Sequence, residues 1–296
     1  MNGCILRAVY NRPEMLYLSM EYEIKARKQL STDNYSTLFA LEHNADPKCV
    51  ELIQDYYPFE KTVVTRSFRH FGWGNILEGF KQAFFEGADY VLNIEDDCLL
   101  HETYFTYMNT ALNLLKGNKF SVINASRRLV PNTSITGVQA TNLFEAPACL
   151  MNGYFFNKYV RPYATYDYYT NRETIIHLVN KRNGDDKRSK YRAERKNLFQ
   201  HIGWDGLVNR LIDTAFIEEG LRSYSPMCDR QIHIGFYGQN RIGKLPFKHP
   251  EFADRVEALR DTALNAAKMM QLDPNYKDYV DFASQLDAWS GELTLI

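Results

Sequence analysis

Residues 87–100, GADYVLNIEDDCLL, decide the expected fold of this chain. A mostly apolar run over residues 88–94 follows a glycine and stops at Glu95, Asp96 and Asp97. A run of this length, bounded by a glycine and a polar break, is typical of a fully buried strand. The pattern therefore predicts a strand of a largely parallel sheet that ends in adjacent carboxylates.

Adjacent carboxylates at the end of a buried strand repel one another and lose hydration, so something must compensate their charge. A divalent cation held by oxygen ligands is a common compensation. In open α/β sheets, ligands bind outside the carboxyl ends of the strands. The acids therefore predict a metal site at the crevice of the sheet, and the alternative is a solvated acidic turn.

The composition is that of an ordinary soluble protein, with 45% hydrophobic and 24% charged residues among 296. A net charge of −1 excludes the overall basic field of a strong nucleic-acid binder. Five scattered cysteines without a CxxC pair indicate neither a disulfide framework nor a zinc knuckle. The charges of Arg7, Arg12 and Glu14 argue against a signal-peptide core in residues 1–20. The lack of a run of about 18–20 apolar residues predicts no membrane span. We therefore expect a soluble, cytoplasmic protein.

Strands and helices are expected to alternate along the first half of the chain. The strands are predicted at 4–10, 35–41, 61–65 and 120–124, and the helices from Pro13 and at 47–57, 75–86 and 102–115. The helix at 75–86 is expected to turn five apolar residues to the core, namely Ile76, Leu77, Phe80, Phe84 and Phe85. This alternation predicts a mostly parallel sheet with helices on both faces.

Later segments are less regular. Residues 125–141 are expected to form a loop or irregular strands, and 148–156 a buried segment. Two helices are predicted at 251–271 and 275–289. The charge run at 181–196 holds eight basic residues against three acids. It is interpreted as a solvated loop, with contact to a polyanionic acceptor as the alternative.

Taken together, the motifs resemble those of GT-A-fold nucleotide-sugar glycosyltransferases. Their order is NRPE after the first strand, then HFGWGN, DYVLNIEDD, GWDG and DRQIHIGFYG. The pattern is most similar to the N-acetylglucosaminyltransferase I type, whose acidic triplet is also EDD rather than DxD. The resemblance covers about residues 1–240 in the order of elements. The charge run and the last 50 residues have no counterpart in it.

The resemblance implies a donor site built on the acidic triplet. Arg12 corresponds to the arginine after the first strand, which approaches the nucleotide. Glu95 and Asp96 correspond to the positions that face the ribose and the nucleotide. Asp97 corresponds to the position that coordinates the metal bridging the diphosphate.

Further roles are implied for three segments in the second half. Asp205 corresponds to the general base of inverting members, and its alternative role is a helix N-cap. Asp229 and Arg230 belong to a segment that resembles the loop closing over the phosphates. His233 departs from the closest group but is similar to the C-terminal histidine that ligates metal in other GT-A enzymes. Its alternative role is that of a buried core histidine.

The implied architecture is a GT-A-like, mostly parallel Rossmann-type sheet flanked by helices, with a C-terminal helical extension. Residues 1–125 are expected to bind the nucleotide sugar, 126–248 to build the acceptor side, and 249–296 to form the extension. The implied activity is metal-dependent, inverting transfer of a hexosyl or pentosyl group to a hydroxyl of a glycan or small molecule. The implied donor is a UDP-sugar, and the implied cation is Mn²⁺, with Mg²⁺ as the alternative.

The sequence leaves two other functions open and disfavours a third. A phage-type DNA glycosyltransferase acting on a hydroxymethylated base would use the charge run at 181–196 to contact DNA. A non-catalytic protein of the same fold would bind a sugar nucleotide or glycan without turnover. A nucleotidyltransferase is disfavoured, because NRPE supplies no glycine-rich phosphate loop after the first strand.

Overall fold

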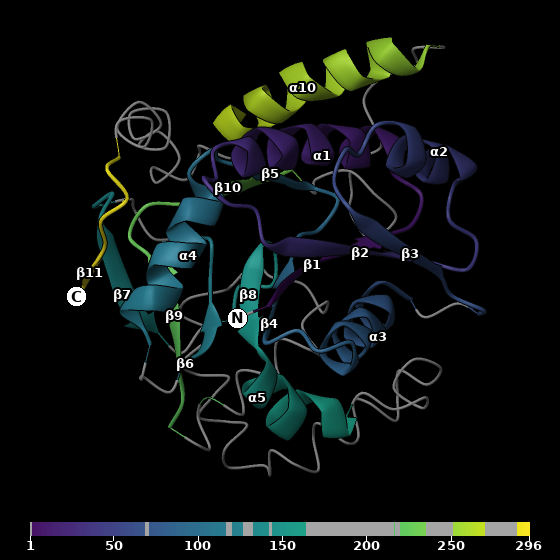
Figure 1. The fold of residues 1–296 in the computed structure, drawn as a ribbon. Helices are drawn as coiled ribbons and strands as arrows, with labels where there is room; N and C mark the ends of the chain where they lie inside the picture. Colours follow the sequence, from purple (N-terminus) through teal and green to yellow (C-terminus); the bar gives the residue numbers. More distant parts are fainter. Residues whose placement is uncertain are drawn as a thin grey trace, which may run out of the picture.

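The main feature of the fold is one large mixed sheet flanked by helices. The computed structural model describes residues 2–68, 71–116, 120–126, 133–141, 144–163, 216, 220–234, 251–269 and 289–296. Within these residues the main sheet has the strand order β11-β7-β9-β6-β8-β4-β1-β2-β3, and β10 pairs with β5 in a separate two-stranded sheet. Figure 1 shows helices on both sides of the main sheet.

The bounds of the elements follow the chain. The strands are β1 Gly3–Val9, β2 Tyr35–Leu41, β3 Lys61–Thr65, β4 Tyr90–Asn93, β5 Cys98–Leu100, β6 Phe120–Ile123, β7 Gly137–Thr141, β8 Cys149–Asn152, β9 Arg222–Pro226, β10 Gln231–His233 and β11 Thr294–Leu295. The helices are α1 Pro13–Lys28, α2 Pro47–Asp55, α3 Phe71–Phe85, α4 Tyr104–Leu114, α5 Gly153–Phe155, and α10 Phe252–Met269, with a π-helix at Phe156–Val160 and a 3₁₀ turn at Arg161–Tyr163.

The predicted mostly parallel sheet is confirmed. Strand β1 pairs in parallel with β2 and β4, and β2 pairs in parallel with β3. Strand β8 runs antiparallel to its neighbours β4 and β6, and β7 runs antiparallel to β9. Because β7, β8 and β9 belong to the same sheet as β1, the predicted halves 1–125 and 126–248 share one sheet. Their separate donor and acceptor roles stay predictions.

Local signals explain where several elements begin. Helix α1 starts with Pro13, whose fixed φ suits the first turn and whose missing N–H costs nothing there. Helix α2 starts in the same way at Pro47, and the side chain of Asp46 accepts a hydrogen bond from the backbone N–H of Lys48 at 2.8 Å. Gly87, which precedes β4, has a φ of +95°, a conformation that favours glycine.

The core lies on both faces of the sheet, because successive side chains of a strand point to opposite faces. On β1, Leu6 is buried with residues of α3, whereas Ile5 is buried with residues of α4. Helices α1 and α2 cover Val9 and Phe39. Helix α10 lies outside α1, which separates it from the main sheet (Figure 1).

Some expectations about the fold are wrong. Phe85, predicted to face the core, is 86% exposed, because it lies about 100° around the helix from Phe84, which packs against the core. Residues 125–141 include the regular strand β7.

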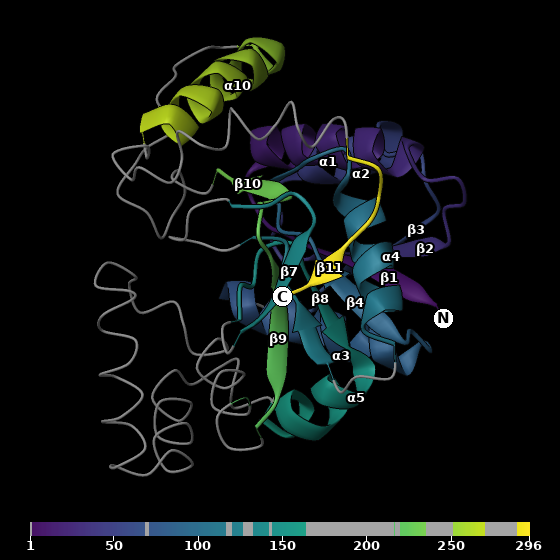
Figure 2. The same ribbon diagram turned by 90° about the vertical axis from the view of Figure 1, so that its left-hand side faces the viewer.

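The predicted C-terminal helical extension is confirmed for α10 only. The second predicted helix, at 275–289, lies almost wholly outside the described residues. The final residues are not helical: they return to the sheet, where β11 pairs in parallel with β7 (Figure 2). No helix among the described residues is long and apolar enough to cross a membrane.

Candidate functional site

The acidic turn lies where the order of the parallel strands reverses. From β1 the chain proceeds to β2 and then β3 on one side, whereas β4 pairs with β1 on the other side. Arg12 follows β1, and residues 95–97 follow β4, so both segments lie at the carboxyl edge of adjacent strands. In open α/β sheets this reversal point forms the crevice in which ligands bind.

Arg12 binds two of the three acids. Its Nε donates to Asp96 Oδ2 at 3.1 Å and its Nη1 donates to Asp97 Oδ2 at 2.8 Å. Its Nη2 also contacts Asp96. Both aspartates are only 4% exposed, so their charges need this compensation. The arginine predicted to lie at the end of the first strand therefore meets the predicted triplet.

The two aspartates experience different environments. Burial raises the pKa of Asp96, and the opposing charge of Arg12 does not fully offset that effect. Burial also acts on Asp97, but His233 and Arg12 together hold the pKa of Asp97 well below its usual range. Burial would lower the pKa of Arg12, but Asp96 and Asp97 raise it above its ordinary value. Asp97 is thus the carboxylate best suited to remain ionised.

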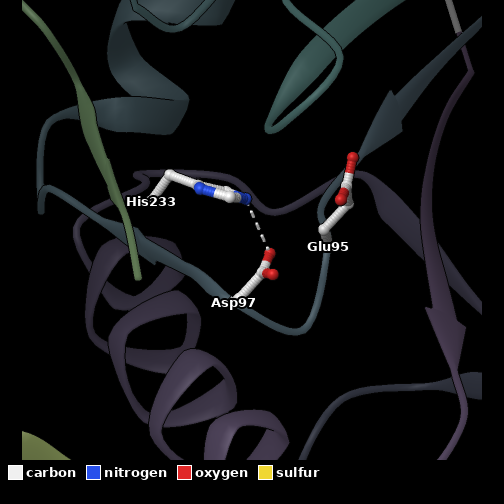
Figure 3. Close-up of side chains that lie close together, drawn as sticks. All are labelled: Glu95, Asp97 and His233. Atoms are coloured by element: carbon white, nitrogen blue, oxygen red, sulfur yellow. Dashed lines mark ion pairs between the residues drawn. The ribbon is translucent and has the colours of Figure 1, made fainter. Parts of the chain in front are cut away.

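Glu95, Asp97 and His233 form a cluster whose potential ligand atoms all lie within 4.8 Å of one another. Asp97 Oδ1 lies 3.2 Å from His233 Nε2, and Figure 3 shows Glu95 on the other side of the same space. The other oxygen of Asp97 is held by Arg12, so Oδ1 is the atom turned to the cluster. Carboxylates and an imidazole together suit a divalent cation, so these residues fit the predicted metal site.

The backbone brings His233 to the acidic turn. Strand β10 pairs antiparallel with β5, which places His233 opposite Cys98, the residue after Asp97. The backbone N–H of Ile234 donates to the carbonyl of Asp97 at 2.8 Å. His233 is therefore not a core histidine packed away from the acids. The structure groups Glu95 with Asp97 and His233, although the sequence predicted a nucleotide contact for Glu95.

A buried polar network holds the backbone of the acidic turn at residues 95–98. Ser19 Oγ on α1 donates to the carbonyl of Cys98 at 2.7 Å and lies 3.3 Å from the carbonyl of Glu95. Arg7 on β1 donates to Ser19 Oγ through Nη2 at 3.1 Å and to Glu23 Oε2 through Nε at 2.5 Å. Sequence reasoning missed this support. The sequence feature that could have revealed this network is a charged residue, Arg7, inside the apolar run CILRAVY.

Replacing Ser19 by alanine is expected to weaken cation binding at the cluster by about tenfold, as loss of a supporting hydrogen bond typically does. The reason is that the carbonyls of Glu95 and Cys98 lose the hydroxyl that holds the turn. Titration with Mn²⁺, followed by calorimetry, measures the effect. The matched control is Ser223→Ala, because Ser223 is also fully buried but its hydroxyl bonds to Thr141. Equal Mn²⁺ affinity in both variants would contradict the supporting role.

The arginine predicted to contact the donor phosphates is enclosed in the protein. Arg230 is 1% exposed, and its guanidinium lies 4.4 Å from the ring centroid of Trp289 and 5.4 Å from that of Tyr107. It also donates to Thr103 Oγ1 at 3.3 Å. This environment favours a structural role for Arg230 over the predicted donor contact. Asp229 is half-buried beside it, and its donor contact stays a prediction.

Two predicted features cannot be placed in the site. Asp205, the predicted base, and the charge run at 181–196 lie outside the described residues. Their roles stay predictions.

Two charged residues that the sequence analysis did not single out lie on the same edge of the sheet. Glu42 follows β2 and is buried, and Arg66 follows β3. Asn75 links this edge to α3, because its Oδ1 accepts from Arg66 Nε at 2.8 Å and its Nδ2 donates to the carbonyl of Ala40 at 2.6 Å. A polar residue directly after each predicted strand was the signal that could have identified them.

Comparison with known proteins gives distant structural matches only. No protein-family model matches the chain, and no curated protein matches it. The crystal structure of S. aureus TarS 1-349 matches with a TM-score of 0.42 and 13% identity, over 53% of this chain and 48% of the TarS chain. TarS 1-349 in complex with UDP-GlcNAc matches with a TM-score of 0.40 and 13% identity, over 53% and 47%. The matched part therefore spans about half of either chain.

Proposed function

We propose that this chain is a metal-dependent glycosyltransferase that takes a sugar from a nucleotide-sugar donor. The observation that supports this proposal is the charged cluster at the reversal point of the sheet. There Arg12 binds Asp96 and Asp97, and Glu95 and His233 lie beside Asp97. A cation site beside an arginine, in the ligand-binding crevice of an open sheet, suits a nucleoside diphosphate group.

Each residue of the site has a proposed task. Glu95, Asp97 and His233 would hold a divalent cation, with Mn²⁺ proposed over Mg²⁺ because Mg²⁺ dehydrates reluctantly and rarely binds to a set made of protein ligands alone. When bound, such a cation stabilises the negative charge that develops on a diphosphate leaving group. Arg12 keeps Asp96 and Asp97 in place and adds positive charge on the same side. We propose a UDP-sugar as the donor.

Asp205 is the proposed general base, which takes the proton of the acceptor hydroxyl. Asp205→Asn is expected to lower transfer by about 10²-fold or more, because a positioned base contributes that much to a proton-transfer step. Donor binding is expected to stay near the wild-type value, which calorimetry with the nucleotide can measure. A lower melting temperature with near-normal turnover would instead identify Asp205 as a helix cap. A large loss of turnover with retained binding supports inverting transfer with Asp205 as base.

The proposed function is tested by incubating the protein with a panel of sugar nucleotides and Mn²⁺. Release of nucleoside diphosphate is the expected result, and excess EDTA is expected to stop it. Binding of a sugar nucleotide without any release or transfer would identify a non-catalytic binding protein. Undiminished release in excess EDTA would overturn the metal dependence.

The acceptor is proposed to be a hydroxyl of a glycan or small molecule. The DNA alternative depends on the charge run at 181–196, and no described residue favours it. Adding duplex DNA that carries hydroxymethylated bases to the same assay separates the two. Transfer to that DNA in preference to saccharide acceptors would overturn the proposed acceptor class.

A further inference from the structure

Helix α10 is fastened to α1 by two ion pairs. Arg255 Nε lies 2.6 Å from Glu14 Oε1, and Arg260 Nη2 lies 2.8 Å from Glu21 Oε2. In Figure 1 the two helices run side by side, with α10 on the outside. The motif pattern of the sequence assigns no role to this segment. Its attachment to α1 raises the question of what the helix does there.

The inner side of α10 shares an apolar cluster with the segment that carries His233. Leu259 is fully buried, and it belongs to one apolar cluster with residues from α1, β5 and the end of β10. The buried members of this Leu259 cluster are Met15, Leu18, Leu99, Ile234 and Leu259. Ile234 directly follows His233, and its backbone N–H binds the carbonyl of Asp97 at 2.8 Å. The cluster therefore includes a residue that is bonded directly to the acidic turn.

The segment around His233 needs outside support. Strands β5 and β10 have three residues each and pair only with one another. A two-stranded pair of this kind is marginally stable in water by itself, so packing against other elements must fix its position. Leu99 of β5 and Ile234 after β10 both belong to the Leu259 cluster. Leu259 of α10 thus shares one buried cluster with a residue from each side of the pair.

We propose that α10 is a positioning element for the candidate metal site. By burying Leu259 in the cluster with Ile234 and Leu99, it holds the β5–β10 pair together and keeps the His233 ring beside Asp97. The part of this inference that concerns the metal rests on the proposed function. The part that concerns the β5–β10 pair rests on the packing alone. The two parts are tested by separate measurements.

The first measurement is hydrogen exchange of the metal-free protein. In Leu259→Ala, peptides that contain the Ile234 amide are expected to exchange about tenfold faster or more, because a buried leucine anchors the pair. Val256→Ala is the matched control, since Val256 is also buried on α10 but lies outside the Leu259 cluster. Leu259→Met, which keeps most of the volume, is expected to restore slow exchange. Equal exchange in Leu259→Ala and wild type, or equal acceleration in Val256→Ala, would overturn the proposal.

The second measurement is Mn²⁺ affinity by calorimetry. Leu259→Ala is expected to weaken Mn²⁺ binding by about tenfold, as loss of a supporting contact to a ligand does. In a His233→Ala background, Leu259→Ala is expected to have no further effect, because the ligand it positions is already gone. If Leu259→Ala weakened Mn²⁺ binding about tenfold in the His233→Ala background as well, the link to His233 would be overturned. If wild type binds no Mn²⁺, the proposed function fails, and the exchange result still decides whether α10 holds the β5–β10 pair.

Discussion

Asp97→Ala is expected to reduce release of nucleoside diphosphate by about 10³-fold, because a Lewis acid at the leaving group is worth several kcal/mol and each 1.36 kcal/mol is a factor of ten. Asp97 is the central member of the cluster: one oxygen faces His233 and the other is held by Arg12. Removing it leaves Glu95 and His233 without the ligand between them. Steady-state assays with Mn²⁺ and the best donor of the panel measure the loss.

The control for Asp97 is an acid that is also paired with an arginine. Asp33 binds Arg27 at 2.8 Å and precedes β2, so it lies at the opposite edge of the sheet. Asp33→Ala is expected to leave turnover near that of wild type. Asp97→Asn, which keeps the size of the side chain, separates loss of the charge from loss of packing. If Asp97→Ala and Asp97→Asn both retain wild-type turnover while folded, Asp97 does not bind a catalytic metal.

Arg7→Met is expected to destabilise the protein by about 3–5 kcal/mol, the usual cost of removing one partner of a buried ion pair. Arg7 and Glu23 are both fully buried, so the carboxylate of Glu23 would lose its closest compensating charge. Arg27 lies 3.5 Å from the other oxygen of Glu23 and offsets part of the loss. Urea unfolding measures the change in the free energy of unfolding.

The double variant tests the cause of that loss. Arg7→Met combined with Glu23→Met removes both charges and is expected to recover more than half of the lost free energy, because no buried charge is left uncompensated. The control is Lys25→Met, which removes one of the two cations paired with Glu21; the Lys25 side chain is 50% exposed. Exposed pairs contribute at most about 1 kcal/mol. A cost for Arg7→Met as small as that for Lys25→Met would contradict the prediction.

Several elements of the fold could be predicted from local sequence signals. The strands at 35–41 and 61–65 were predicted with the bounds that the structure has, because β-formers between turn residues are a local signal. The helix starts at Pro13 and Pro47 could be predicted as well, because a proline at the first helical position is also a local signal. Phe85 was placed wrongly, because of the two adjacent phenylalanines only Phe84 turns to the core, and the sequence does not show which of them does.

The sequence by itself determined the alternation of strands and helices, the acids at the end of β4 and the arginine after β1. These features depend on neighbouring residues and on the rule that ligands bind at the carboxyl edge of parallel strands. Only the tertiary structure decided that Glu95 joins Asp97 and His233, that Arg230 is enclosed beside Trp289, and that Leu259 of α10 belongs to the same buried cluster as Ile234. These contacts join residues far apart in the chain, and no local pattern encodes which distant side chains meet. The first arises from the pairing of β10 with β5, and the last from the packing of α10 on α1.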